Sequence, residues 1–289
     1  MLAPDPTHAA AGRRELFRAY LRGRAAVYGY LLGCGGAFLV GAWQQSPLIM
    51  AAGPAAVALG VAGIAWYAAD RAAAGNFYRK LSQSLGLFLV GRAELLPLTP
   101  LLGAGDRRHC ENWMQGTLPG DPPLRGGFGH FVYEEIPKKR GDDAELVQLS
   151  ESHRLALCLA ELEPSIALFK GVFMRPRPGL FDFGEDWQRR NHLRTLQLES
   201  AAFTDRYQLR ITDDQDERRA RELFSPTLVN FLATHPLAPC FELKAGTLAV
   251  FVPRVLEDEG NLVFLLDAAR HIAGRVLREV EEAAARPAA

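Results

Sequence analysis

The chain has 289 residues, enough for two domains, and its 33 basic and 33 acidic side chains give a formal net charge of zero. A nucleic-acid-binding protein needs a basic face, so this balance predicts no nucleic-acid partner. Four scattered cysteines without a Cys-x-x-Cys pair indicate free thiols in a reducing cytosol rather than a disulfide framework.

Residues 1–24 form a basic N-terminal segment that we place in the cytoplasm. Leu16, Phe17, Tyr20 and Leu21 recur at helical spacing among arginines, which predicts an amphipathic helix lying on the anionic inner leaflet of a membrane. A simple basic anchor that only sets membrane topology explains the same pattern.

Residues 25–69 contain no Asp, Glu, Lys or Arg. A bilayer core about 30 Å thick takes roughly 20 apolar residues per helix, so this run suffices for two passes. Gln44 and Gln45 interrupt it, followed by Pro47, which suits the start of a helix. We therefore predict a transmembrane helical hairpin with spans at residues 25–43 and 48–69.

The orientation of the hairpin follows from its charged flanks. Basic residues precede the first span and follow the second, whereas the turn carries none, so both termini are predicted to be cytoplasmic in a two-pass inner-membrane protein. These basic residues are Arg13, Arg14, Arg18, Arg22, Arg24, Arg71, Arg79 and Lys80.

Small residues four apart allow two membrane helices to approach closely. Gly29 with Gly33 in the first span and Ala56 with Gly60 in the second are the predicted packing positions.

Two alternatives compete for the first apolar run. Residues 40–42 could pass for a signal-peptide cleavage site, and Cys34 ends a stretch that resembles a lipoprotein box. A second apolar run follows at once, which favours a span, and Cys34 is then a small buried residue of a membrane helix.

The region after the hairpin begins with a connecting helix predicted at residues 70–90, where aromatic and aliphatic residues recur at three- and four-residue steps. Frequent Gly and Pro predict loops with short elements at 91–123. A hairpin of strands at 127–136 and 146–149 follows, with a charged tip at 137–143.

Further strands are expected at 154–161, for which a helix is the alternative, and at 166–174, 196–200 and 207–211. Two helices come next, the first capped at 212–214 and ending near 224, the second opened by Ser225 and Pro226. The chain closes with a hairpin of strands at 240–244 and 247–252, then a long amphipathic helix at 261–282.

Strands that precede segregated helices predict an α+β fold with a mainly antiparallel sheet for a cytoplasmic domain at residues 91–285. Part of this domain carries a family pattern in Phe169-Lys170-Gly171-Val172-Phe173, Leu198-Glu199-Ser200, Phe203, Tyr207, Asp213 or Asp214, Arg219-Ala220 and Leu223-Phe224-Ser225-Pro226. Over residues 169–252 the chain resembles the bacterial membrane proteins grouped as domain of unknown function 3137. The resemblance implies a membrane-anchored cytoplasmic domain and no established chemistry, and Ser225 stands where Thr is expected.

Metal-ligating side chains gather around residues 109–130, on or beside a predicted loop. His109, Cys110, Glu111 and His130 are the candidates for a metal site, but their spacing matches no zinc motif. No cofactor is predicted.

The densest basic set in the soluble part comprises Arg175, Arg177, Arg189, Arg190 and Arg194. These side chains could dock on the inner leaflet or on an acidic partner. A solvated loop face balanced by nearby acidic residues is the alternative.

These patterns predict an integral membrane protein whose cytoplasmic α+β domain is an interaction or scaffold module for a protein partner. A membrane-bound metal-dependent hydrolase using residues 109–130, or an inner-leaflet lipid-binding module, is the alternative. The sequence assigns no enzymatic activity and no catalytic residue.

Overall fold

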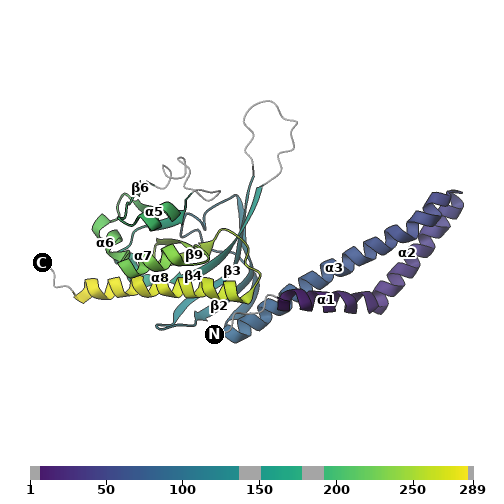
Figure 1. The fold of residues 1–289 in the computed structure, drawn as a ribbon, viewed down its shortest axis with the longest axis horizontal. Helices are drawn as coiled ribbons and strands as arrows, with labels where there is room; N and C mark the ends of the chain where they lie inside the picture. The colour runs from purple at the N-terminus through teal and green to yellow at the C-terminus, as the bar shows by residue number, and fades with distance from the viewer. Residues whose placement is uncertain (1–6, 137–150, 178–191, 286–289) are drawn as a thin grey trace, which may run out of the picture. The chain divides into compact units, whose positions relative to one another are not determined.

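The computed structural model describes residues 7–136, 151–177 and 192–285. The chain forms two compact units, residues 1–81 and residues 82–289. The first unit is helical, and the second contains one antiparallel sheet with helices (Figure 1). The predicted α+β class with a long C-terminal helix is therefore correct.

Three helices build the first unit: α1 (Thr7–Arg22), α2 (Arg24–Trp43) and α3 (Pro47–Leu85). A tight turn joins α2 to α3, and within it Gln45 adopts the left-handed conformation, with φ of 51°. Pro47 occupies the first position of α3, where its missing N–H would have no helical partner anyway. The predicted pair of helices and its turn are thus present.

α3 is longer than the sequence suggested. It continues without interruption from the apolar block to Leu85, so the helix predicted at residues 70–90 is present to Leu85 as the continuation of α3, whereas residues 88–90 belong to a strand. Asp70 and Arg71 change the polarity of the helix surface but keep its backbone hydrogen bonds. The alanines that follow them favour helix, so nothing ends α3 at the apolar boundary.

α1 packs on α3 through two contacts one helical turn apart on each helix. The rings of Phe17 and Trp66 meet edge to face with centroids 5.1 Å apart. Arg13 Nε lies 2.7 Å from Asp70 Oδ1. The predicted amphipathic N-terminal helix therefore uses part of its apolar face, and one of its arginines, against α3.

Two helices of this unit are long and apolar enough to cross a membrane, over residues 25–43 and 52–85. Only 6% of the residues in the apolar window of the first and 11% in that of the second are buried inside the structure. Packing against the rest of the protein therefore buries few of the residues in these two apolar windows.

The sheet of the second unit has nine strands in the described part of the chain, in the order β1-β2-β3-β4-β9-β8-β5-β7-β6. Every neighbouring pair is antiparallel. The strands are β1 (Phe88–Ala93), β2 (Arg107–Leu118), β3 (Leu124–Glu135), β4 (Glu151–Glu161), β5 (Val172–Pro176), β6 (Leu193–Thr195), β7 (Tyr207–Thr212), β8 (Cys240–Lys244) and β9 (Thr247–Val252).

The loops predicted at residues 91–123 are wrong in their middle, because β2 occupies twelve of these residues. β2 lies between β1 and β3, so its backbone groups are paired on both sides. Trp113 and Met114 are buried there. Strand pairing and burial therefore override the turn-forming bias of the glycines and prolines, all of which except Gly116 lie outside β2.

The hairpin predicted after residue 127 is confirmed only for its first strand. β3 pairs with β4, which begins at Glu151, and the strand predicted at residues 154–161 is correct, whereas the helix alternative is not. The expected second strand at 146–149 and the charged tip at 137–143 lie outside the described residues.

Three boundaries in the next stretch differ from the prediction. Residues 163–167 form a short 3-10 helix, η1 (Glu163–Ala167), so the strand expected from residue 166 begins only at Val172. β6 ends before Leu196, and Ser200 instead caps the unpredicted helix α5 (Ala201–Arg206) by accepting a hydrogen bond from the Phe203 N–H.

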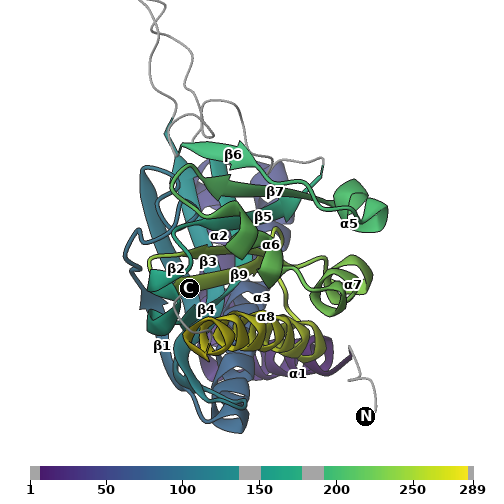
Figure 2. The same ribbon diagram turned by 90° about the vertical axis from the view of Figure 1, so that its left-hand side faces the viewer.

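The later helices and strands follow the predicted order. α6 (Glu217–Leu223) starts later than expected because Asp216 caps it, not residues 212–214. Ser225 caps α7 (Pro226–Thr234), as predicted, and the hairpin of β8 and β9 turns at residues 245–246. α8 (Glu259–Ala285) confirms the long amphipathic helix and lies along one face of the sheet, over β4 and β9 (Figures 1 and 2).

The opposite face of the sheet is covered at one point by the segment between β1 and β2. Leu101 and Leu102 of this segment are buried, and the Leu101 N–H donates to Glu242 Oε2 at 2.7 Å. The other oxygen of Glu242, a fully buried β8 residue, pairs with Arg175 of β5 at 2.5 Å. The core is therefore built on both faces of the sheet, and the Arg175–Glu242 ion pair is buried in it.

Candidate functional site

The candidate metal ligands lie on adjacent strands, not on a loop. His109, Cys110 and Glu111 belong to β2, and His130 belongs to β3 directly opposite Glu111. Side chains alternate along a strand, so Cys110 points to the other face of the sheet from His109, Glu111 and His130. Among the residues that the structure describes, no three His, Cys, Asp or Glu side chains come together as a metal site.

Each of these side chains has an ordinary role in the sheet. His130 Nε2 lies 3.0 Å from the Leu256 carbonyl, and burial lowers the pKa of its imidazole, which makes it a neutral donor. Although burial opposes it, pairing with Arg154 and a 3.4 Å contact with His109 hold the pKa of Glu111 below its usual value. Burial raises the pKa of the Cys110 thiol to about 12.

The arginine set does not form one exposed surface in the described part of the domain. Arg175 is buried against Glu242, and Arg194 pairs with Glu217 at 2.8 Å. Arg177 is exposed and donates to the Thr204 carbonyl at 3.3 Å. The remaining two, Arg189 and Arg190, lie outside the described residues. Of the three described arginines, only Arg177 is available to a membrane or an acidic partner.

The hairpin packs through one of the four predicted positions. A Cβ placed on Gly33 would lie 2.6 Å from Val57 Cγ1, so α2 and α3 touch there. A Cβ on Gly29 or Gly60 would meet nothing within 4 Å, so neither glycine is a point of close approach, and Ala56 is exposed. The second close approach is instead between Gly53 and Ala37, 2.7 Å from the Gly53 Cβ position.

Cys34 lies beside this contact. Its sulfur is 4.0 Å from the Pro54 carbonyl oxygen, consistent with a thiol that faces the neighbouring helix. The lipidation alternative stays a hypothesis.

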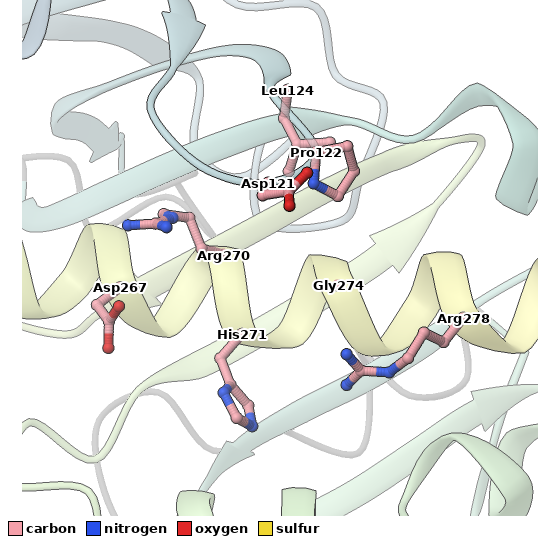
Figure 3. Close-up of a pocket in the computed structure, with 8 residues that line it drawn as sticks. All are labelled: Asp121, Pro122, Leu124, Asp267, Arg270, His271, Gly274 and Arg278. Carbon is pink, nitrogen blue, oxygen red and sulfur yellow. The ribbon is translucent and has the colours of Figure 1, made fainter.

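A groove crosses α8 where the helix passes the turn between β2 and β3. The groove is open to solvent on one side and has a volume of about 230 Å³; Figure 3 shows its lining. The lining residues are Asp121, Pro122, Leu124, Asp267, Arg270, His271, Gly274 and Arg278. Arg270, Gly274 and Arg278 are four residues apart, so all three lie on one side of the helix.

His271 forms the side of the groove toward α7. Its ring stacks on Phe231 of α7, with centroids 4.1 Å apart and an angle of 16°. Burial lowers the pKa of His271, although the Asp267 carboxylate acts in the opposite direction. The imidazole is therefore neutral at pH 7 and provides hydrogen-bonding nitrogens rather than charge.

Sequence reasoning placed these α8 residues on a long helix but did not single them out. The signal that could have found them is Gly274, a glycine inside a strong helix with an arginine one helical turn away on each side. The turn at residues 121–124 also lines the groove, and only the tertiary fold brings it next to α8.

Sequence reasoning also missed an exposed apolar edge. β1 is the first strand of the sheet order, and Phe88, Leu89 and Val90 on it are exposed, Phe88 at 77%. Leu96 and Leu98, just beyond the strand, are exposed as well. These five residues, which we term the β1 edge, were assigned in part to a helix, so their exposure was not anticipated.

Comparison with known proteins adds no functional assignment. No family model matches the chain, and neither a curated protein nor a solved structure matches it.

Proposed function

We propose that the protein is a membrane-anchored interaction module: α2 and α3 span the inner membrane, and the sheet domain binds a protein partner in the cytoplasm. The observation that carries the anchor is the exposure of large apolar side chains on uncharged helices. Leu32 and Leu59 are 77% and 76% exposed, and Leu39 and Ile64 are similarly open. In water such a surface is unfavourable, whereas acyl chains solvate it without cost.

The orientation follows from the same basic flanks as in the sequence. The α2–α3 turn contains the uncharged residues Gln44 and Gln45 and no basic residue. It is therefore the part of the hairpin that is translocated across the membrane most easily. α1 supports this arrangement, because Tyr20 and Leu21 stay exposed beside arginines while Phe17 packs on Trp66. An aromatic pair of this kind suits the interface between headgroups and acyl chains.

The β1 edge is the proposed partner-binding surface. Among the described strands β1 has a neighbour on one side only, which leaves backbone N–H and C=O groups open on the other. Register shifts between Leu89 and Gly91 and between Gly91 and Ala93 restrict regular pairing to residues 88–89, which carry exposed apolar side chains. The occupant that fits is an extended apolar segment of a partner protein, added as a short strand.

Cysteine labelling in intact cells tests the topology. The native thiols are unsuitable targets, because Cys110, Cys158 and Cys240 are fully buried. Gln44→Cys should react with a membrane-impermeant maleimide in intact cells, and Asp213→Cys, on the exposed surface of the domain, only after the membrane is permeabilised. Reaction of Asp213→Cys in intact cells would contradict the proposed orientation.

Purification of the full-length protein in mild detergent from its host tests partner binding. We expect one stoichiometric partner by mass spectrometry, lost from the Phe88→Asp variant and retained by Phe264→Asp, which alters an exposed aromatic on α8. Equal retention by both variants would remove the β1 edge from the proposal. Elemental analysis of the same sample tests the hydrolase alternative, and one zinc per chain would make His109 and His130 the next residues to mutate.

A further inference from the structure

Gly274 is unexplained by the packing of the fold. Inside a helix a glycine is less stable than alanine, so it is normally retained where another atom comes close. Gly33 of α2 and Gly53 of α3 satisfy that condition, since a Cβ on Gly33 would lie 2.6 Å from Val57 Cγ1 and one on Gly53 would lie 2.7 Å from Ala37 Cβ. A Cβ on Gly274 would meet nothing within 4 Å. Because Gly274 has no side chain, its backbone forms the floor of the groove on α8, which we call the α8 groove.

The two arginines on either side of this floor lack ion-pair partners in the described part of the chain. Arg275, on the same helix, pairs with Glu279 and Glu282 and donates to the Glu222 and Leu223 carbonyls. No such contact is found for Arg270 or Arg278 among the described residues. Uncompensated guanidinium groups lining a cavity match a phosphate, whose oxygens accept two hydrogen bonds from one arginine.

The charges of the groove are arranged asymmetrically. Arg270 lies against Gly120, which precedes Asp121, and one turn of helix separates it from Asp267, so this end holds both carboxylates. Arg278 is eleven residues beyond Asp267, about 16 Å along the helix axis. It points back along α8 toward Gly274 and His271 (Figure 3).

We propose that the α8 groove binds a small phosphate ester that also carries an ammonium or hydroxyl group. The phosphate lies over Gly274 and is bound by Arg278, with His271 beside it. The donor group of the ligand reaches Asp121 and Asp267, and Arg270 lies between the two ends. The volume of 230 Å³ holds roughly eight water-sized groups of about 30 Å³, comparable with the eight non-hydrogen atoms of phosphoethanolamine.

Isothermal titration with O-phosphoethanolamine tests the site in the full-length protein, reconstituted in phosphatidylcholine nanodiscs. We expect saturable binding to one site per chain, and weaker binding of inorganic phosphate, which brings no donor for the carboxylates. Asp121→Asn should reduce this preference. Equal affinity for the two probes would overturn the assignment of the aspartates, and no saturable binding of either would overturn the site.

Variants separate a ligand site from adventitious charge. Arg278→Gln should weaken binding at least about tenfold, while Arg218→Gln, an exposed arginine of α6, should bind as the native protein does. Gly274→Ala should abolish or strongly weaken binding and at the same time raise Tm by about 1–4 °C, because alanine favours helix. Binding that survives both Gly274→Ala and Arg278→Gln would overturn the proposal.

The phosphate could belong to a soluble metabolite or to a lipid headgroup. Replacing half of the phosphatidylcholine by phosphatidylethanolamine distinguishes these sources. A lipid headgroup in the groove would lower the apparent affinity for the soluble probe, whereas an unchanged affinity would assign the groove to a soluble ligand.

Discussion

The helical hairpin and the sheet domain treat apolar side chains in opposite ways. On α2 and α3 the large aliphatic residues point outward, as Leu32 and Leu59 do, while in the sheet Leu157 and Phe251 are fully buried. The two units also differ in charge. Residues 25–69 carry none, whereas the sheet domain buries the Arg175–Glu242 pair. The contrast is what we expect if, as proposed, α2 and α3 are solvated by acyl chains and the sheet domain by water.

The largest expected effect is on the buried ion pair. Glu242→Gln leaves the Arg175 guanidinium without its buried carboxylate, so we expect the free energy of unfolding of the sheet domain to fall by about 3–5 kcal/mol. Glu161→Gln is the control, because Glu161 pairs with Arg125 only at 3.8 Å on the surface, and should change it by less than about 1 kcal/mol. Denaturant titration in detergent measures both, and equal effects would show that the buried pair is not special.

A matched pair of leucines tests the comparison of solvents directly. Leu157→Ala creates a cavity in the sheet and should cost about 2–5 kcal/mol. Leu59→Ala removes the same atoms from an exposed helix position, and acyl chains can fill the space, so the stability of the sheet domain should not change. Chemical denaturation in nanodiscs compares them. If Leu59→Ala destabilises the sheet domain as much as Leu157→Ala does, the two units are not independent.

Two glycines of α2 test where the hairpin helices touch. Gly33→Val forces methyl groups into Val57 and should weaken the helix contact by about 1–3 kcal/mol, so the adjacent Cys34 becomes more reactive. Gly29→Val meets open space and should leave Cys34 unchanged. The rate of Cys34 alkylation by a membrane-permeant maleimide reads out both variants. A faster rate in Gly29→Val alone would place the contact on the other side of α2.

The last effect is not a loss of stability at neutral pH but a pH dependence of the sheet domain. Burial lowers the pKa of His130, His235 and His271 below the ordinary value of 6.5, so the folded domain binds fewer protons than the unfolded chain. Their contribution is fully present above about pH 6.5 and is lost as the pH falls toward the lowered values, by up to about 1.4 kcal/mol per pH unit for each histidine. His130→Gln should reduce the slope between pH 6.5 and 5. An unchanged slope would show that His130 does not carry it.

Local signals in the sequence determined several elements. The uncharged run at residues 25–69 predicts two long apolar helices, because about 20 apolar residues are enough for one helix that spans a bilayer. Ser225 followed by Pro226 starts α7, and Ala245-Gly246 turns the hairpin of β8 and β9. In each case the deciding interaction is made within a few residues, so the pattern alone carries it.

Only the tertiary structure decided the elements that depend on distant partners. β2 forms in a stretch rich in glycine and proline because β1 and β3 pair with it and Trp113 is buried. Arg175, which reads as a surface cation, is buried because Glu242, 67 residues away, faces it. Gly274 borders a groove because a turn some 150 residues earlier in the chain lies over α8. Such contacts depend on which strands become neighbours, and spacing along a single sequence does not contain that information.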